Sequence, residues 1–518
     1  MDKRTRIQDN LRTNTVSRRR FLSGAGAAGL GVLLGAAPQS SDAERAARAA
    51  RPNLLIILSD DHSAPHLSCY GDANLKTPNL DRFASQGIRF TRAYVTASQC
   101  VPSRASILTG RCPVGIQMAR FSAPLPAEVP TLPDLLRSAG YFTGLGGRTY
   151  HLDGQPGSPE VQKLYDERGL ATMPGRVDWV NRDANREKAP QFFRGFLDKV
   201  PAGRPFFLQF CFSDPHRPFT AGLNRDPNTL KLPGHYPDTA ILREDLASYY
   251  AELERLDGDI GVLLSVLDER KLSDNTLVLF MGDNGCSLLR GKGTLYELGV
   301  HVPLIVRWPG VARAGSVADS LVSGEDITPT LLAAAGVPAA QSMTGVSFLP
   351  VLRGESVPGR RYVFCQRGAH ATGLPDNRSA FDLLRCVITP RHKLIYNALP
   401  GLSYAPIDIA GSNVWKHLAD LKAEGKLPSP FAAIYHTPQR PMFELYDLEN
   451  DPAELNNLAG KSQTATLERE LKAELSKWMV LERDFLPIPL VDTAAVGGKA
   501  AANKAKRAAN RAKKDNQK

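Results

Sequence analysis

The stretch from Asn53 to His62 reads Asn-Leu-Leu-Ile-Ile-Leu-Ser-Asp-Asp-His, a compact apolar run that ends in polar residues. Such a run is typical of a strand in a parallel sheet, because crossover helices cover both faces of the strand and make it apolar throughout. The stretch therefore predicts a buried strand over Asn53 to Leu58, followed by a loop that presents carboxylates.

The same pattern of an apolar run ending in polar residues recurs three times along the chain. Tyr141 to Leu145 precedes Gly147 to His151, Phe206 to Phe212 precedes Ser213 to Arg217, and Thr276 to Met281 precedes Gly282 to Gly285. Helical patterns separate the runs, one of them from Arg243 to Arg270, so we expect an α/β fold with a large, mostly parallel sheet flanked by helices. Ligands bind beyond the carboxyl ends of such strands, which predicts that the four polar clusters form one site.

A smaller C-terminal region begins near Arg360 and has its own pattern. Short apolar runs predict strands at Val363 to Gln366, Leu384 to Thr389, Lys393 to Tyr396 and Glu444 to Leu448, and a helical pattern runs from about Thr464 to Glu482. We expect these elements to form an antiparallel sheet-and-helix subdomain.

The 518-residue chain is long enough for one large domain and a smaller one. The predicted parts are a leader over residues 1–43, a catalytic domain over 50–355, a C-terminal subdomain over 356–492 and a basic disordered tail over 493–518. The seven cysteines are too sparse for a disulfide scaffold, and no pairing is predicted.

The net charge of +11 belongs to the two ends of the chain. Residues 1–37 carry +5 and residues 499–518 carry +7, which leaves about −1 for the rest. We therefore expect no nucleic-acid partner. Ser17 to Leu22, reading Ser-Arg-Arg-Arg-Phe-Leu, with the Gly/Ala-rich stretch to Ala37, resembles a twin-arginine export signal and is too weakly apolar for a membrane span. The alternative is a basic disordered leader.

The polar clusters contain oxygen ligands that suit a hard cation. Asp60, Asp61, Asp283 and Asn284 would bind Ca²⁺ or Mg²⁺ well and zinc poorly. Asp-Asp alone is more often a helix cap or a solvated turn. Because Asp-Asp follows one strand and Asp-Asn-Gly follows another, a metal site is favoured.

Residues Cys100 to Gly110 read Cys-Val-Pro-Ser-Arg-Ala-Ser-Ile-Leu-Thr-Gly. Pro102 suits a first helical turn and the following residues continue a helix, so Cys100 is expected at the positive end of the helix dipole, where an anion is favoured. Arg104 lies one turn further on. A buried cysteine before an ordinary helix is the alternative, but Cys, Pro, Ser, Arg and the closing Leu-Thr-Gly together favour a functional motif.

The undecapeptide resembles the signature of type I sulfatases, and the resemblance extends from about Pro52 to Ala459. It implies the sulfatase, alkaline-phosphatase-like fold, oxidation of Cys100 to formylglycine, and one bound Ca²⁺ held by the modified Cys100 together with Asp60, Asp61, Asp283 and Asn284. An aldehyde hydrate can attack sulfur with one hydroxyl and expel sulfate with the other, which a thiol cannot do. The resemblance also implies partners, namely a sulfatase-maturing enzyme such as the formylglycine-generating enzyme and, for the leader, the twin-arginine translocation machinery.

The resemblance also implies roles for the basic side chains. Arg104 supports the hydrate, Lys292 binds sulfate or leaving-group oxygens, His151 is the base that releases sulfate, and His216 assists the leaving group. Singly, either histidine is more often structural, so these roles depend on the joint pattern. Arg148 stands where the family usually has a lysine; it can bind a sulfate oxygen but donates a proton poorly.

Segments around Arg204 to Phe207, Asp214 to Arg217 and Lys393 to Asn397 are most similar to the heparan N-sulfatase (sulfamidase) subgroup. The expected function is that of a periplasmic or secreted sulfatase that removes the N-sulfate of a terminal glucosamine in heparan-type fragments. The alternatives are an exo-acting O-sulfatase, a phosphatase or phosphonate hydrolase of the same superfamily, and a non-catalytic polyanion-binding protein that uses the basic tail.

Overall fold

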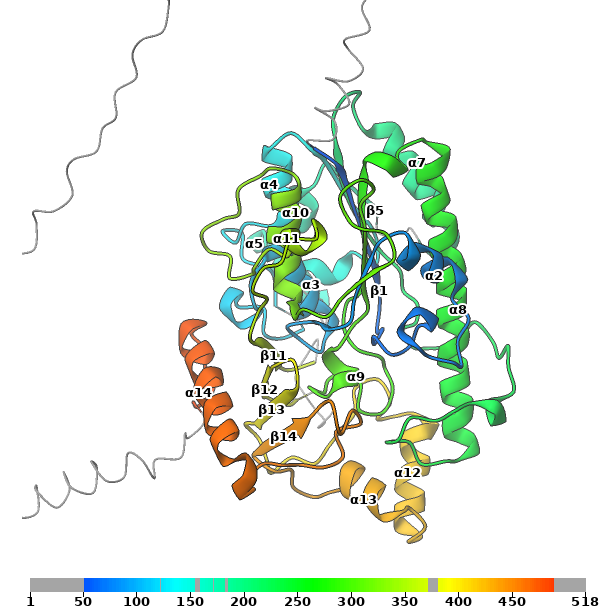
Figure 1. The fold of residues 1–518 in the computed structure, drawn as a ribbon, viewed down its shortest axis with the longest axis vertical. Coiled ribbons are helices and arrows are strands. Elements are labelled where there is room, and N and C mark those ends of the chain that lie inside the picture. Colours follow the sequence, from blue (N-terminus) through cyan, green and yellow to red (C-terminus); the bar gives the residue numbers. More distant parts are fainter. Residues whose placement is uncertain are drawn as a thin grey trace, which may run out of the picture. The chain divides into compact units, whose positions relative to one another are not determined.

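A computed structural model describes residues 51–488 except 122, 154–158, 171, 182–184 and 371–380 (Figure 1). The predicted leader and the basic tail lie outside the described residues, so both remain predictions, as do the four domain boundaries. In the described part of the chain, no helix has the length and hydropathy needed to cross a membrane.

The main sheet confirms the predicted architecture. Within the described residues its strand order is β5-β4-β6-β1-β7-β8-β2-β9. These strands are β1 (Asn53–Ser59), β2 (Ile88–Phe90), β4 (Phe142–Gly147), β5 (Trp179–Asn181), β6 (Phe206–Cys211), β7 (Thr276–Gly282), β8 (Leu304–Arg307) and β9 (Ser316–Ala318). All neighbours are parallel except the pairs of β8 with β7 and with β2. Two further strands, β3 (Ala93–Tyr94) and β10 (Val322–Ser323), pair beside it.

Helices cover both faces of this sheet (Figure 1). In β1, Leu54, Ile56 and Leu58 pack into one apolar cluster and Leu55 and Ile57 into another, as the period of two in a strand requires. The first cluster includes residues of α3 (Cys100–Thr109), α4 (Leu132–Ser138) and α10 (Ile327–Ala334). The second includes residues of α2 (Pro78–Ser85), α7 (Ala189–Lys199) and α8 (Ala240–Glu269). The other helices here are α5 (Pro159–Arg168), α6 (Met173–Arg176), α9 (Glu297–Val300) and α11 (Leu349–Leu352).

A second, antiparallel sheet follows in the C-terminal part, as predicted. It has the order β11 (Val363–Arg367), β12 (Leu384–Ile388), β13 (His392–Asn397) and β14 (Phe443–Asp447). Helix α14 (Ala465–Leu481) packs on one face through Leu471, Leu475 and Trp478. The segment 398–442 connects β13 to β14 and carries α12 (Asn413–Ala423) and α13 (Ser429–Tyr435).

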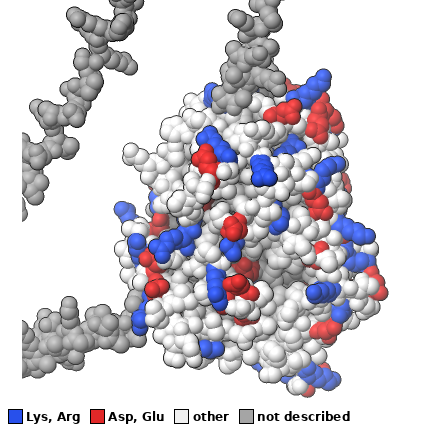
Figure 2. All heavy atoms as spheres, viewed as in Figure 1, with Lys and Arg blue, Asp and Glu red and all other residues white. Residues whose placement is uncertain are grey.

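The surface charges are mixed on the face shown in Figure 2, where basic and acidic side chains lie among each other and no continuous basic band is visible. The seven cysteines all lie among the described residues and are free thiols. Cys100 is one of six that are buried.

Gly147 ends β4 and directs the chain toward the predicted site residues Arg148 and His151. Its φ is +75°, and a Cβ there would lie 2.1 Å from the backbone oxygen of Cys211 on β6. An alanine would therefore both strain the backbone and push apart two paired strands.

We expect Gly147→Ala to lower the free energy of unfolding by roughly 3 kcal/mol, because left-handed strain and overpacking each contribute on the order of 1–2 kcal/mol. Gly140→Ala is the matched control: its φ is +91°, but a Cβ would meet nothing within 4 Å. Urea unfolding of the two variants would separate strain from the clash, and equal losses would contradict the proposed clash.

Candidate active site

The polar clusters that follow four neighbouring strands lie at one edge of the large sheet. Ser59 at the end of β1 is in register with Gly282 of β7, and Gly147 of β4 is in register with Cys211 of β6. The loops that leave these strands therefore start side by side. Helix α3 brings Cys100, its first residue, to the same edge.

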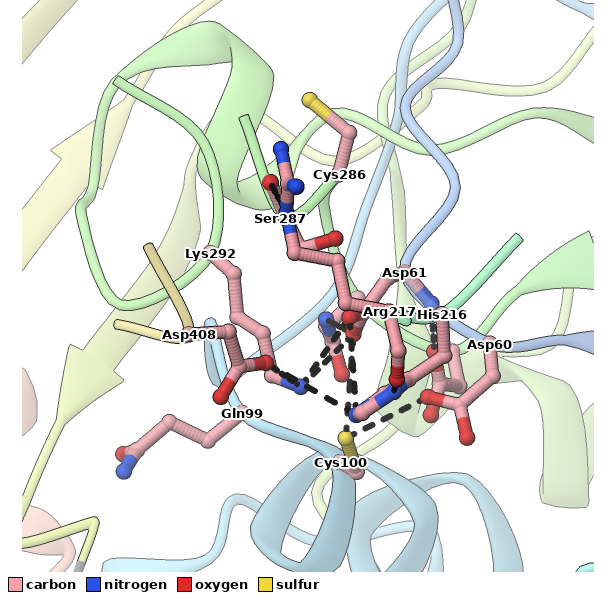
Figure 3. Close-up of polar contacts among 12 residues, drawn as sticks. Asp60, Asp61, Gln99, Cys100, His216, Arg217, Cys286, Ser287, Lys292 and Asp408 are labelled. Atoms are coloured by element: carbon pink, nitrogen blue, oxygen red, sulfur yellow. Dashed lines mark hydrogen bonds and ion pairs between the residues drawn. The ribbon is translucent and has the colours of Figure 1, made fainter. Parts of the chain in front are cut away.

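An acidic cluster surrounds Cys100 (Figure 3). The Cys100 thiol lies 3.4 Å from an oxygen of Asp60 and 3.9 Å from an oxygen of Asp61. Asp283 accepts a hydrogen bond from the backbone N–H of Asp61 at 3.0 Å, and the Asn284 side-chain amide donates to Asp61 at 2.9 Å. All five residues are fully buried. The four oxygen-bearing side chains predicted to bind a metal thus lie together with the cysteine.

Asp61 has an unusual backbone conformation for a residue other than glycine, with φ at +64°. Its backbone N–H is held by Asp283 and its carbonyl accepts a hydrogen bond from Tyr249 at 3.1 Å. Strained backbone of this kind persists only where the surroundings fix it, and it concentrates at functional sites. The conformation turns the Asp61 carboxylate toward Asn284 and Lys292.

Two arginines neutralise part of the acidic cluster. Arg104 donates to Asp283 at 2.8 Å and lies 3.3 Å from Asp60, and Arg148 lies 2.9 Å from Asp60. Burial alone would raise the pKa of Asp60, but Arg148 and Arg104 hold that pKa well below its ordinary value. For Asp283 the balance differs, because burial and the negative charge of Asp60 raise its pKa to about 7. The two arginines therefore offset only part of the negative charge that Asp60 and Asp283 carry.

The side chains of Lys292 and His216 also lie close to the Asp61 carboxylate (Figure 3). Lys292 Nζ lies 2.9 Å from one Asp61 oxygen, and His216 Nε2 lies 3.7 Å from the other. Burial would lower the pKa of Lys292, but the carboxylates of Asp408 and Asp61 raise it well above its ordinary value, so the ammonium stays charged. The His216 Nδ1–H donates to the carbonyl of Arg217, which leaves Nε2 to face the site.

His151 completes the predicted set. Its ring nitrogen, an oxygen of Asp60 and the Cys100 sulfur all lie within 4.8 Å of one another. Burial and the charge of Arg104 lower the pKa of His151 well below its ordinary value, so the ring is neutral and able to accept a proton. The structure thus brings the ten predicted site residues together, with nine of them around Cys100.

The structure adds Asp408, His370 and Gln99, which sequence reasoning missed. Asp408 lies 2.7 Å from Lys292 Nζ, and His370 Nε2 lies 4.0 Å from Asp408. Gln99 immediately precedes Cys100, and its amide nitrogen lies 3.3 Å from His370 Nδ1. Asp408 and His370 occur singly in irregular segments, and no sequence pattern sets either apart. Gln99 directly precedes the Cys100 motif, and this position is the sequence feature that could have indicated a place in the site.

Comparisons with known proteins point to one family. Residues 52–337 match the family described as Sulfatase, and residues 289–395 match the family described as N-sulphoglucosamine sulphohydrolase, C-terminal. The human N-sulphoglucosamine sulphohydrolase is 30% identical over 472 residues, which cover 83% of this chain and 90% of the relative. An ulvan-active sulfatase of Formosa agariphila is 28% identical over 497 residues, covering 85% of this chain and 76% of the relative.

A solved structure shares the fold. It is a complex with the substrate D-glucosamine-2-N,6-O-disulfate, with a TM-score of 0.62 and 22% identity, and the match covers 84% of this chain and 99% of that chain.

Proposed function

The chain belongs to the sulfatase family and is a sulfuric ester hydrolase, and from that premise we propose that it removes the N-sulfate of a terminal glucosamine in heparan-type saccharides. The observation that supports the sulfate chemistry is the buried cluster in which Cys100 lies beside four oxygen-bearing side chains and three cationic ones. The C-terminal family match and the human relative support the choice of an N-sulfate.

The donor set fits a divalent cation, which we propose to be Ca²⁺. Asp60, Asp61, Asp283 and Asn284 supply only hard oxygen atoms, as calcium prefers. Within the described part of the chain, the buried carbonyl oxygen of the Asn284 side chain has no hydrogen-bond partner. A buried oxygen of this kind suits a metal ligand. Bound there with the modified Cys100, the cation would polarise a sulfate oxygen and acidify the nucleophilic hydroxyl.

Cys100 is proposed to act as formylglycine, whose hydrate supplies the hydroxyl that attacks sulfur. The site itself argues against a thiol nucleophile. Burial and the charge of Asp60 raise the pKa of the Cys100 thiol well above its ordinary value, and a neutral thiol is a poor nucleophile. The acidic neighbours that would suppress a thiolate are also the ones that suit a cation.

The basic side chains have separate tasks in this proposal. Lys292, kept charged by its carboxylate neighbours, neutralises the sulfo oxygens, and Arg148 binds them from the side of Asp60. His216 presents Nε2 to the leaving atom and delivers a proton to it. His151, neutral and buried beside Cys100, takes the proton that must depart when sulfate is released. Arg104 holds Asp60 and Asp283 in place.

Export remains a proposal from the sequence. The twin-arginine motif at residues 17–22 and the Gly/Ala-rich stretch that follows it to Ala37 lie outside the described residues. We propose that a formylglycine-generating or similar maturing enzyme modifies Cys100 before the folded protein is exported to the periplasm or medium.

A substrate panel tests the proposed function. We expect sulfate release from N-sulfoglucosamine to exceed release from 6-O-sulfated and 2-O-sulfated sugars by at least about tenfold in kcat/KM, because a site that hydrogen-bonds one substrate rejects analogues that leave its polar groups unpaired. Ion chromatography of released sulfate measures all three with one readout. Faster release from either O-sulfated sugar would instead support an exo-acting O-sulfatase.

A further inference from the structure

Asp408 places a carboxylate beside the basic side chains of the proposed sulfate site. One of its oxygens lies 2.7 Å from Lys292 Nζ and 3.7 Å from His216 Nε2, the two groups that the proposed mechanism places at the sulfo group and the leaving atom (Figure 3). The Asp408 side chain is 23% exposed, whereas that of Lys292 is 1% exposed. The carboxylate therefore stands on the solvent side of Lys292, where the saccharide has to enter.

Polar contacts link Asp408, through His370, to Gln99, the residue that precedes Cys100. Gln99 donates its amide to His370 Nδ1, so the proton of the neutral His370 ring is on Nε2, which lies 4.0 Å from Asp408. Burial and the charge of Lys292 lower the pKa of His370 to about 3, so this ring adds no positive charge. Among the described residues, the hydrogen bond to the Asp408 carboxylate comes from Lys292, which leaves lone pairs for a ligand.

An ionised Asp408 is unfavourable next to a bound sulfate unless something separates the two charges. Lys292 holds the pKa of Asp408 below its ordinary value although burial acts in the opposite direction, so the carboxylate is charged. Like charges in contact repel, most strongly in a partly desolvated pocket. A ligand group that donates a hydrogen bond to Asp408 would turn this repulsion into an attraction.

N-sulfates and O-sulfates differ at this point. The bridging nitrogen of a sulfamate carries a hydrogen, whereas the bridging oxygen of a sulfate ester carries none. In hydrolysis, R–NH–SO₃⁻ and water give R–NH₃⁺ and SO₄²⁻: the S–N bond breaks, the electron pair stays on nitrogen, and nitrogen takes two protons from water. A carboxylate beside the leaving atom would bind the N–H of the substrate and the ammonium of the product.

We propose that Asp408 is a specificity-determining residue that accepts a hydrogen bond from the bridging N–H and so selects N-sulfates over O-sulfates. The inference depends on the proposed N-sulfatase function. It assigns the choice of leaving atom to the segment 398–442, which lies outside the Cys100 motif and the four strand-end clusters.

The test compares Asp408→Asn with the wild-type enzyme on two substrates. The variant keeps the size of the side chain and an oxygen that can accept from Lys292. We expect kcat/KM for N-sulfoglucosamine to fall about 10- to 100-fold, the range of a charge-assisted hydrogen bond. The value for 4-nitrophenyl sulfate, which has no hydrogen on its bridging atom, should fall much less or rise, because Asp61 still stabilises the Lys292 ammonium while the repulsion of the sulfate is relieved. Inhibition by glucosamine should weaken in the variant.

Asp420→Asn, an exposed acid on α12 of the same segment, is the matched control and should leave both substrates unchanged. Equal losses on both substrates in Asp408→Asn would show that Asp408 only supports Lys292, and would overturn the inference while leaving the proposed function intact. A wild-type enzyme that hydrolyses 4-nitrophenyl sulfate but not N-sulfoglucosamine would overturn the proposed function, and the inference with it.

Discussion

Cys100→Ala is expected to lower kcat by roughly 10⁴-fold or more, as the loss of a catalytic nucleophile does in other hydrolases. The substitution removes the sulfur that the proposed oxidation to formylglycine requires, so no hydrate can form at Cβ, and it leaves the surrounding charges in place. Because the Cys100 side chain is fully buried and small, the fold should survive with a loss of about 1 kcal/mol. Sulfate release under saturating substrate measures the first effect, and urea unfolding measures the second.

The same prediction has a chemical readout. In active enzyme, the tryptic peptide that contains residue 100 should lack sulfur and react with an aldehyde-trapping hydrazide. Cys69→Ala is the control, because Cys69 lies on a different part of the chain and is only partly buried, and this variant should keep full turnover. Active enzyme that retains an unmodified thiol at Cys100 would contradict the formylglycine mechanism.

Removing divalent cations is expected to lower activity by roughly 10²- to 10³-fold, the size of effect seen when one electrostatic element of an active site is lost. Asp283 and Asp60 would then face each other without the cation that offsets their repulsion. Re-addition of Ca²⁺ should restore activity and raise the Tm by about 3 °C at a hundredfold excess over Kd, given the entropy of unfolding of a chain this long.

Asn284→Ala provides the matched variant for this experiment. It removes the buried carbonyl oxygen that has no hydrogen-bond partner in the described structure, while the three carboxylates remain. Its Tm should no longer respond to Ca²⁺. Full turnover after exhaustive chelation, with metal analysis showing far less than one ion per chain, would rule out a metal-dependent site.

The sequence predicts the elements of the site well because each lies directly after a strong local pattern. Residues 54–58 alternate between the two faces of the sheet yet are all apolar, so the strand and the carboxylates after it can be recognised together in the sequence. The α3 helix is likewise predicted by its Pro102 and by the residues after it. Tertiary packing agrees with local propensity in these places.

Other parts were not predictable from local pattern. Strands β2, β5 and β9 each have three residues, too few to show a period of two. The contact of Asp408 with Lys292 joins residues 116 positions apart, and neither flanking stretch carries a recognisable motif. Such contacts are set by how the segment 398–442 packs against the sheet edge, which a single sequence does not reveal.

The placement of Asp408 on a connection between two strands of the small sheet has an evolutionary consequence. The proposed catalytic residues around Cys100 follow strands of the large sheet or begin α3, whereas Asp408, the residue proposed to contact the leaving atom, lies on the separate connection 398–442 between β13 and β14. Insertions at such connections are exchanged at little thermodynamic cost. If Asp408 selects the leaving atom as proposed, related proteins could change between N-sulfates and O-sulfates by altering this one connection while the residues around Cys100 stay the same.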